Sequence, residues 1–474
     1  MQIDKWHPAS YGYKDSIKLF NYSALIPYLK HGLNSDRVRD FNNRDESWLN
    51  IGKIKPKDIR LTIDAKLQTK LQKDITEFIK DVCADKIKVG KEHEKFKRYR
   101  NLIRASIVVL DAENGDLLAS ANYPLPSYKR LKDEIREIKG VRLIPPYSDN
   151  GKRSNWTAYT DMDLGLINAT APGSTAKVMS ALAGLKKLGM AAANTNNRDY
   201  SYFVAESQVV GDEPSGEEIN MKKAIVESSN CYFINLVNDY DLYKELSYIY
   251  RTVGTGVGVF DKKVNKKVNR HSYGLFYSDS TNVEKFYDAF NYHNPEGAIS
   301  KYHKYIESGN KSPMIGTVWQ WTWGQGDLAA TPLSMARVAS IVANEGKMVT
   351  TRYITEYETQ NKYVVARDEA KVLGDFMKEE AETHVSSALI KYQNNFIGGK
   401  TGTANRHLYD ENGVKKRSND AWYICYVKDK TDASKNSIAI AVRIERGQSS
   451  TAAKLLVKNK VLNSLADCGY INKD

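Results

Sequence analysis

A serine and a lysine stand three residues apart at the predicted start of a helix. A Pro-Gly pair interrupts whatever precedes Ser174, residues 176–187 are mostly good helix formers, and Gly189 is placed to end the helix. We expect Ser174 to cap this helix, where free backbone N–H groups and the positive end of the helix dipole converge. Lys177 then lies on the same face. A hydroxyl beside an amine, over several N–H donors, provides a nucleophile, its base and half of an oxyanion hole.

Two more motifs carry residue types that assist a serine nucleophile. Ser228-Ser229-Asn230 follows the first motif, and Lys400-Thr401-Gly402 comes much later. Each motif alone has an ordinary explanation, because Ser-x-x-Lys is common and is usually a capped helix with a surface lysine. By the same reasoning Ser228 alone is a helix-terminal serine, Asn230 a local cap and Lys400 an exposed strand lysine. The three motifs together, in this order, favour one shared site.

The ordered motifs resemble those of the penicillin-binding proteins, the serine D,D-transpeptidases that cross-link peptidoglycan. Ser229 departs from the aspartate that is common at the middle position, where members of the family vary. Leu61 to Gln68 resembles the entry to the transpeptidase domain of membrane-bound members. Gly324-Gln325-Gly326 followed by Thr331-Pro332-Leu333 also resembles the family. The resemblance covers residues 58–474.

The resemblance implies a role for each polar residue of the motifs. Ser174 is the expected nucleophile and Lys177 its base, provided that Lys177 is neutral; burial and a second positive charge, such as that of Lys400, would lower its pKa. Ser228 is expected to relay a proton between the leaving amine and either lysine. Asn230 is expected to bind Lys177 and the substrate backbone.

The strand that carries the third motif, Lys400-Thr401-Gly402, is expected to bind the substrate. Thr401 and Thr403 are expected to donate hydrogen bonds to the carboxylate of a D-Ala-D-Ala terminus, and Lys400 supplies positive potential for it. Gly402 permits a close approach of substrate to the strand. By resemblance, the oxyanion hole is formed by the backbone N–H groups of Ser174 and Thr403. One such donor contributes about 3 kcal/mol of transition-state stabilisation.

The order of predicted elements favours an α+β fold with an antiparallel central sheet, flanked by helices and interrupted by an inserted helical subdomain. A hairpin (105–110 and 117–121), three later strands (396–403, 421–427 and 438–444) and a closing helix (449–466) supply the sheet and its cover. Further expected elements are a strand at 59–64, a helix at 65–82 capped by Asp64, a helix at 219–227, and a helix from Thr331-Pro332 to about Asn344.

Composition limits the classes of function. The chain is long enough for one large domain or two ordinary ones, with 41% hydrophobic and 27% charged residues, as in a soluble globular protein. A net charge of this size, +13, usually reflects a solvated basic surface. No nucleic-acid module is recognisable, so nucleic acid is not an expected partner.

Neither the cysteines nor the histidines have metal-ligand spacing, so we expect no metal and no cofactor. Cys231 and Cys425 are expected to be buried free thiols, and the sequence leaves the pairing of the four cysteines open.

We expect residues 1–57 to be an N-terminal extension or the remnant of an upstream domain, and residues 58–474 to be the transpeptidase domain. The sequence contains no apolar run that could span a bilayer and no signal peptide at its start. The resemblance implies work on the outer side of the cytoplasmic membrane, without an anchor in this chain. We therefore expect a fragment of a longer protein.

Three activities remain open. The first is a monofunctional, class B-like transpeptidase that β-lactams inhibit and that works beside a separate membrane glycan polymerase. The second is a serine β-lactamase. The only Glu-x-x-Leu-Asn (46–50) precedes Ser174, whereas class A enzymes carry it after the Ser-x-Asn motif; Ser-Thr-x-Lys fits class D enzymes, which usually have Ser-x-Val instead of Ser-Ser-Asn. The third is a non-catalytic β-lactam sensor or scaffold with an acylable serine.

Overall fold

The computed structural model describes most of the chain from residue 60 onward, and all structural statements below concern these residues: 60–124, 164–166, 169–198, 217–257, 259–261, 266–268, 320–326, 328–353, 355, 358–389, 392–409 and 415–473. The expected extension at 1–57 lies outside them. Among the described residues, no helix is both long and apolar enough to cross a membrane.

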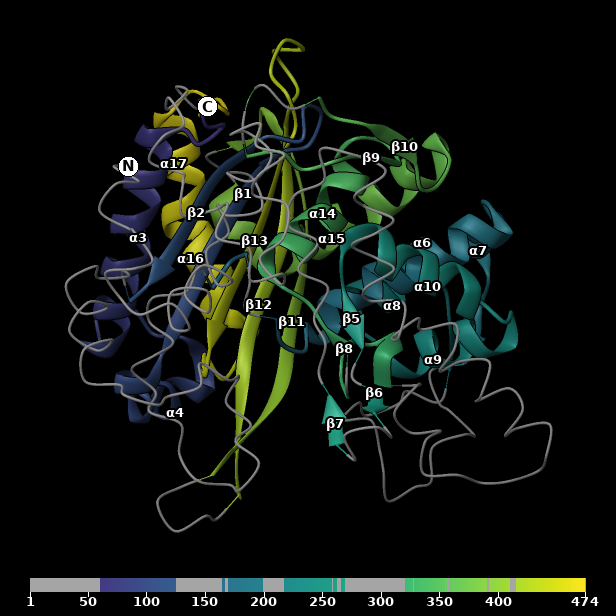
Figure 1. The fold of residues 1–474 in the computed structure, drawn as a ribbon, viewed down its shortest axis with the longest axis horizontal. Helices are drawn as coiled ribbons and strands as arrows, with labels where there is room; N and C mark the ends of the chain where they lie inside the picture. Colours follow the sequence, from purple (N-terminus) through teal and green to yellow (C-terminus); the bar gives the residue numbers. More distant parts are fainter. Residues whose placement is uncertain are drawn as a thin grey trace, which may run out of the picture.

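A five-stranded antiparallel sheet forms the centre of the fold (Figure 1). Its order is β11-β12-β13-β1-β2, so the N-terminal hairpin pairs with the last strand of the chain. The strands are β1 (Arg104–Asp111), β2 (Leu117–Tyr123), β11 (Asn395–Tyr409), β12 (Lys415–Asp429) and β13 (Ile438–Glu445). Alternate residues of β12 enter two separate hydrophobic cores, Trp422 and Ile424 on one side, Tyr423 and Cys425 on the other.

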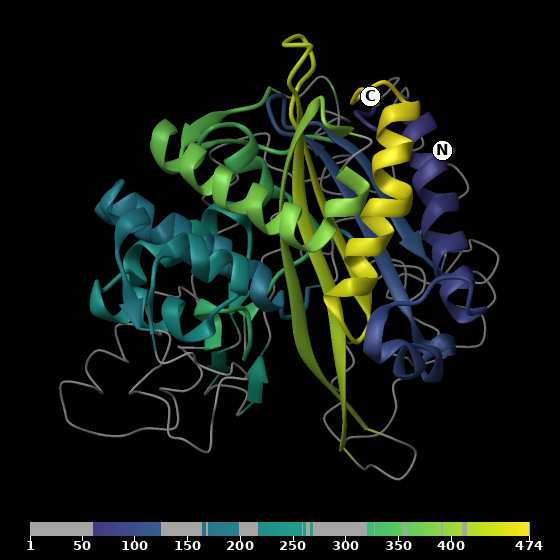
Figure 2. The same ribbon diagram turned by 180° about the vertical axis from the view of Figure 1, so that it is seen from behind.

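One core lies beneath the helices at the two ends of the described chain. α3 (Ala65–Cys83) places its apolar stripe against β2, and the side chain of Asp64 caps it by accepting from two backbone N–H groups. α16 (Ser450–Leu456) and α17 (Leu462–Asp467) are joined by one π-helical stretch, η11 (Val457–Val461). Figure 2 shows this segment beside α3 over the sheet.

The other core lies between the sheet and the inserted helical body. α14 (Pro332–Ala343) is buried along its whole length and contacts β1, β12 and β13. Thr331 caps it and Pro332 occupies its first turn. α15 (Arg367–Leu389) packs along β11 and contacts α6 (Lys177–Leu188) and α8 (Met221–Glu227). α6 in turn contacts α9 (Asn230–Asp239) and α10 (Tyr243–Val253).

Short elements complete the described structure. Helical turns are found at η4 (Gly90–Glu92), α4 (His93–Arg98), η5 (Arg100–Leu102), η7 (Gly173–Ala176) and α7 (Ala191–Asn194). Two-stranded pairs are formed by β3 (Asn197–Arg198) with β4 (Glu218–Ile219), β5 (Gly256–Val257) with β8 (Leu328–Ala329), β6 (Val259–Asp261) with β7 (Lys266–Val268), and β9 (Lys347–Val349) with β10 (Asn361–Tyr363).

The predicted fold class is confirmed, and so are the hairpin, the three later strands and the Asp64 and Thr331 caps. The strand expected at 59–64 is wrong in its described part, residues 60–64, where Leu61 alone forms a bridge. Thr62 is held by its N–H on the Tyr353 carbonyl and by its hydroxyl on the carbonyls of Leu117 and Arg352, so no strand ladder continues. Ile219 lies in β4, since Asn220 caps α8 and starts the helix at Met221.

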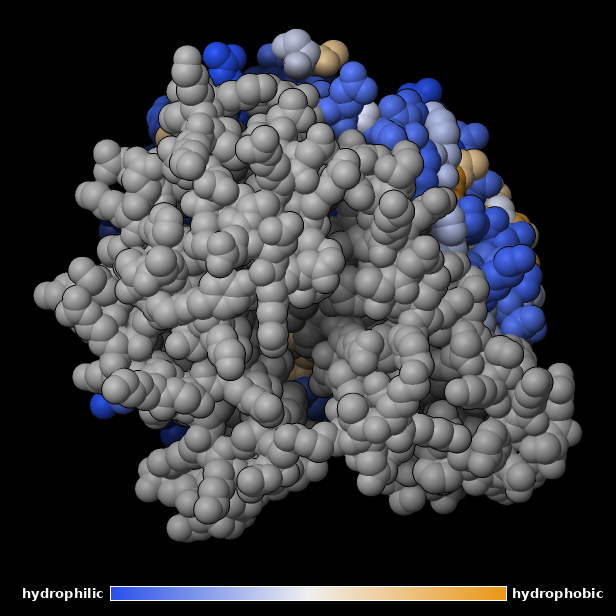
Figure 3. Space-filling view, viewed as in Figure 1, coloured by the Kyte–Doolittle hydropathy of each residue, from blue (hydrophilic) through white to orange (hydrophobic). Residues whose placement is uncertain are grey.

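On the face of the molecule that Figure 3 shows, the described residues that are visible are mainly hydrophilic. Large apolar side chains are exposed singly among the described residues, at Leu61, Met190, Tyr240 and Tyr363. The four cysteines are free thiols, and Cys231 and Cys425 are buried, as expected.

Candidate active site

Ser174 lies inside a 3₁₀ turn and does not cap the following helix. η7 runs directly into α6, and neither element has a side-chain cap at its start, so the predicted capping role is wrong. A 3₁₀ turn has three residues per turn, which aligns side chains at i and i+3, the spacing of Ser174 and Lys177. The predicted helix end at Gly189 is confirmed, with a positive φ of 59°.

The nucleophile turn is pressed against strand β11 at two glycines. Gly173 has φ +58°, and a Cβ there would lie 2.7 Å from the Thr403 carbonyl. A Cβ on Gly402 would lie 2.9 Å from the Pro172 oxygen. Gly324 holds the turn from the other side, because the Gly173 N–H donates to its carbonyl at 2.9 Å. The backbone after Pro172 is therefore fixed beside Thr403.

One hydroxyl oxygen links the two buried lysines. Lys177 Nζ lies 3.0 Å from Ser228 Oγ, and Lys400 Nζ lies 3.2 Å from the same atom. Lys177 also donates to the Ser228 carbonyl. Both lysine side chains are fully buried. Ser228 ends α8 in the left-handed region (φ 63°, ψ 38°), which costs a non-glycine residue about 1–2 kcal/mol.

The other two residues of the second motif begin the next helix. Ser229 Oγ accepts from the Tyr232 N–H at 3.1 Å, which is the geometry of an N-cap of α9. Serine and aspartate both suit an N-cap, so the variation at this position has a physical reason. Asn230 is the first residue of α9, buried beside Ser228.

The two threonines of the third motif have different hydrogen bonds. Thr401 Oγ1 donates to Glu380 Oε1 at 2.7 Å. Thr403 Oγ1 accepts from the Ser450 N–H at 3.1 Å and keeps its own proton for another acceptor. Both hydroxyls are expected to bind a substrate carboxylate. The Thr401 hydroxyl donates its proton to Glu380 instead, whereas the Thr403 hydroxyl can donate its proton to the substrate.

Gln325 occupies the free edge of β11. Its Nε2 donates to the Thr403 carbonyl at 3.1 Å, and its Oε1 accepts from the Asn405 N–H at 3.1 Å. This amide pairs with the edge as a neighbouring strand would, at the place where an extended peptide could add.

A family model of the penicillin-binding protein transpeptidase domain matches residues 105–467 of this chain. The chain belongs to this family. The matched span contains all three motifs and, apart from Arg104 at the start of β1, every strand of the central sheet.

Known members give the same fold. The peptidoglycan D,D-transpeptidase MrdA of Acinetobacter baumannii is 26% identical over 381 residues, which is 75% of this chain and 50% of that protein. This chain thus spans about half the length of that relative. The transpeptidase domain of Burkholderia pseudomallei penicillin-binding protein 3 superposes with a TM-score of 0.53 at 14% identity, over 88% of this chain and 99% of that one. A chain from a peptidoglycan synthase complex that coordinates polymerization and crosslinking gives 0.56 at 20%, over 86% and 62%.

The structure of this penicillin-binding transpeptidase domain thus brings Lys177, Ser228 and Lys400 into contact and sets the Ser174 turn against the third-motif strand. Sequence reasoning missed Glu380, which is buried against Lys400 and Thr401. One signal could have found it. Glu380 follows the buried Met377 by three residues, so it continues the apolar stripe of α15.

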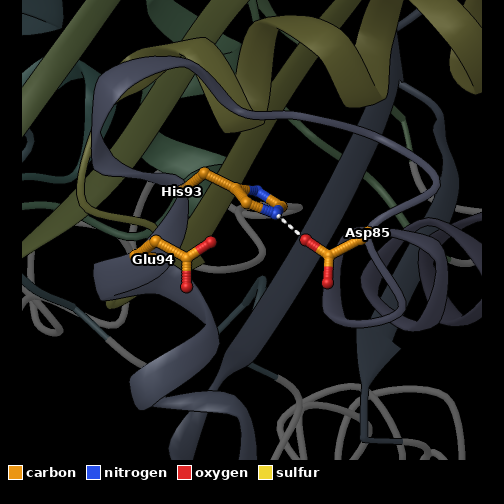
Figure 4. A group of neighbouring side chains, drawn as sticks. All are labelled: Asp85, His93 and Glu94. Carbon is orange, nitrogen blue, oxygen red and sulfur yellow. Dashed lines mark hydrogen bonds and ion pairs between the residues drawn. The ribbon is translucent and has the colours of Figure 1, made fainter.

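Asp85, His93 and Glu94 form the one group of possible metal ligands among the described residues (Figure 4). Asp85 bonds to His93 Nε2 at 2.8 Å and to the ammonium groups of Lys88 and Lys97. These contacts, that with Lys88 first, hold the pKa of Asp85 well below its usual range. Because two lysines already balance this carboxylate, the cluster is an ion-pair network rather than a cation site.

Proposed function

We propose that this chain is a serine D,D-transpeptidase that cross-links peptidoglycan through a serine acyl-enzyme. The observation that carries the proposal is the Ser228 hydroxyl shared by Lys177 and Lys400, beside the turn that holds Ser174. Membership of the transpeptidase family and the similarity to a named peptidoglycan D,D-transpeptidase support it. The same serine is the target of β-lactam antibiotics, which present a strained amide to it.

In the proposed acylation, Ser174 Oγ attacks the carbonyl carbon of the penultimate D-Ala, and neutral Lys177 takes its proton. The backbone N–H groups of Ser174 and Thr403 stabilise the developing oxyanion. The C–N bond then breaks as Ser228 gives its proton to the leaving D-Ala amine and regains one from the Lys177 ammonium. Lys177 is neutral again at the end of the step, and Lys400 remains a cation throughout.

In the proposed transfer step, the amine of a second stem peptide attacks the acyl-enzyme. Its proton passes back through the same groups, and Ser174 Oγ leaves with a proton from Lys177. Before acylation, the terminal carboxylate of the donor stem peptide is held by the Thr403 hydroxyl, by the positive potential of Lys400, and by Thr401 where its hydroxyl turns from Glu380. Gly402 permits the close approach, and Asn230 orients the substrate backbone and Lys177.

The proposal extends to the setting of the enzyme. Residues 58–474 form the catalytic domain, and residues 1–57 are an extension or the remnant of an upstream domain. The enzyme acts at the cell envelope, outside the cytoplasmic membrane, on peptidoglycan stem peptides, and works with a separate membrane glycan polymerase. The similarity to a chain from a synthase complex that coordinates polymerization and crosslinking supports this partner. No cofactor enters the steps above.

The test is intact-protein mass spectrometry after incubation with benzylpenicillin. We expect a stable adduct on the wild type and on Ser434→Ala, which changes an exposed loop serine, and none on Ser174→Ala. Rapid antibiotic hydrolysis without an adduct would point to a β-lactamase. A folded wild type with neither adduct nor hydrolysis would refute Ser174 as nucleophile. Release of D-Ala from a D-Ala-D-Ala peptide separates the transpeptidase from a sensor, which would form the adduct alone.

A further inference from the structure

Glu380 is a buried carboxylate on α15 that none of the three motifs includes. Its Oε1 accepts from the Thr401 N–H and from Thr401 Oγ1, each at 2.7 Å. The same oxygen lies 3.5 Å from Lys400 Nζ, and both side chains of this ion pair are fully buried. Glu380 Oε2 has no hydrogen-bond partner among the described residues, so Oε1 makes the polar contacts that we describe.

We propose that Glu380 is a positioning residue of the acyl-transfer site, which keeps Lys400 charged and fixed on the Ser228 hydroxyl. This inference rests on the proposed function. A carboxylate within ion-pair distance favours the charged form of its partner, and burial makes that interaction strong because little water screens it. The hydrogen bonds to Thr401 hold the carboxylate beside the very strand that carries Lys400.

The two lysines cannot be treated independently. Both Nζ atoms lie within hydrogen-bond distance of Ser228 Oγ, at 3.0 and 3.2 Å. Two positive charges that share one oxygen in a buried site repel each other, so a charge fixed on Lys400 disfavours a second one on Lys177. Glu380 thereby gives the two lysines different charge states. Lys400 stays the cation, and Lys177 becomes the neutral amine that can accept the Ser174 proton.

The surroundings of Glu380 leave Lys400 as its principal partner. Tyr423 and Cys425 on β12 face it, and burial followed by the charge of Glu380 raises the pKa of both, so both are neutral near pH 7. Lys454 on α16 also interacts with the charge of Glu380, but it is only half-buried. Burial lowers the pKa of Lys400 itself, and Glu380 opposes that shift.

The experiment compares pH profiles of acylation by a fluorescent penicillin in the wild type, Glu380→Gln and Glu379→Gln. Glutamine keeps the shape and an acceptor oxygen for Thr401 but removes the charge. Glu379 is the adjacent control, a half-exposed residue paired with Lys222. An opposite charge at this range shifts a pKa by about 1–3 units. We therefore expect the basic limb of the Glu380→Gln profile to move down by at least about one pH unit, while Glu379→Gln follows the wild type.

The proposal would be overturned if both limbs of the Glu380→Gln profile stayed at the wild-type pH values, even if the maximal rate fell. A merely structural role of Glu380 lowers the rate without moving the limbs. If Glu380→Gln does not fold, as judged by thermal melting, Glu380→Asp decides. Aspartate keeps the charge but draws it back by one methylene, so the basic limb of Glu380→Asp should also move to lower pH. A folded Glu380→Asp whose basic limb coincides with that of Glu379→Gln would overturn the positioning role of Glu380. Failure to acylate the wild type would instead refute the proposed function, and the role of Glu380 in it.

Discussion

Removing the hydroxyl that the two lysines share tests the geometry of the site most sharply. Ser228→Ala deletes the one acceptor that Lys177 Nζ and Lys400 Nζ are described as sharing, but leaves the left-handed backbone in place. Ser228→Gly deletes the same hydroxyl and also relieves the backbone, because glycine adopts φ 63° without a steric cost. The pair of variants therefore separates the chemistry of Ser228 from its strain.

The magnitudes follow from the contacts. A positioned proton relay contributes about 10²–10⁴-fold to a rate, so both variants should lose acylation rate by at least about 100-fold. A non-glycine residue in the left-handed region costs about 1–2 kcal/mol, so the free energy of unfolding of Ser228→Gly should exceed that of Ser228→Ala by about 1 kcal/mol. The assays are the second-order rate constant of acylation by a fluorescent penicillin and urea unfolding, with Ser434→Ala as the control. A Ser228→Ala variant that acylates within about threefold of the wild type would refute the relay.

Two further predictions concern the framework of the site, and a third concerns the contact between α3 and α17. Gly324→Ala would place a Cβ 1.9 Å from the Gly173 oxygen, so the nucleophile turn must move, and we expect acylation to fall by at least about tenfold; an unchanged rate would contradict the clamp. Ser229→Ala removes the α9 cap on Tyr232 and should lower the free energy of unfolding by about 1 kcal/mol in urea titrations, with acylation little changed; a large loss of acylation in a stable protein would give Ser229 a chemical role. Burial raises the pKa of Asp74, so the folded state holds that proton more tightly than the unfolded state, and stability falls as pH rises through the ordinary aspartate range near 3.8. Asp74→Asn should thus gain up to about 1 kcal/mol at pH 7, after allowance for its partial exposure, and lose the advantage below about pH 4; an equal gain at both pH values would refute the assignment.

Local chemistry predicts much of this fold, because several elements carry their own start signals. Thr331 followed by Pro332 specifies a helix start in any context, and the structure keeps it. The continuous apolar run from Ala421 to Val427 fits a strand buried on both faces. These features depend on residues that are neighbours in sequence, so no tertiary information is needed to find them.

The site itself depends on tertiary contacts that sequence spacing does not encode. A capped α-helix and a 3₁₀ turn accept the same residues around Ser174, and the choice is made by Gly324 and β11 pressing on Gly173. Glu380 is one of three glutamates within residues 378–382, and only the packing of α15 on β11 selects it as the partner of Lys400.

The most direct test of the central claim is to locate the acyl group by tandem mass spectrometry of peptides from the benzylpenicillin-treated protein. We expect the added mass to lie on Ser174, and Lys177→Ala to slow its appearance greatly without moving it to another residue. An adduct on a different residue, or undiminished labelling of Ser174→Ala, would contradict the account.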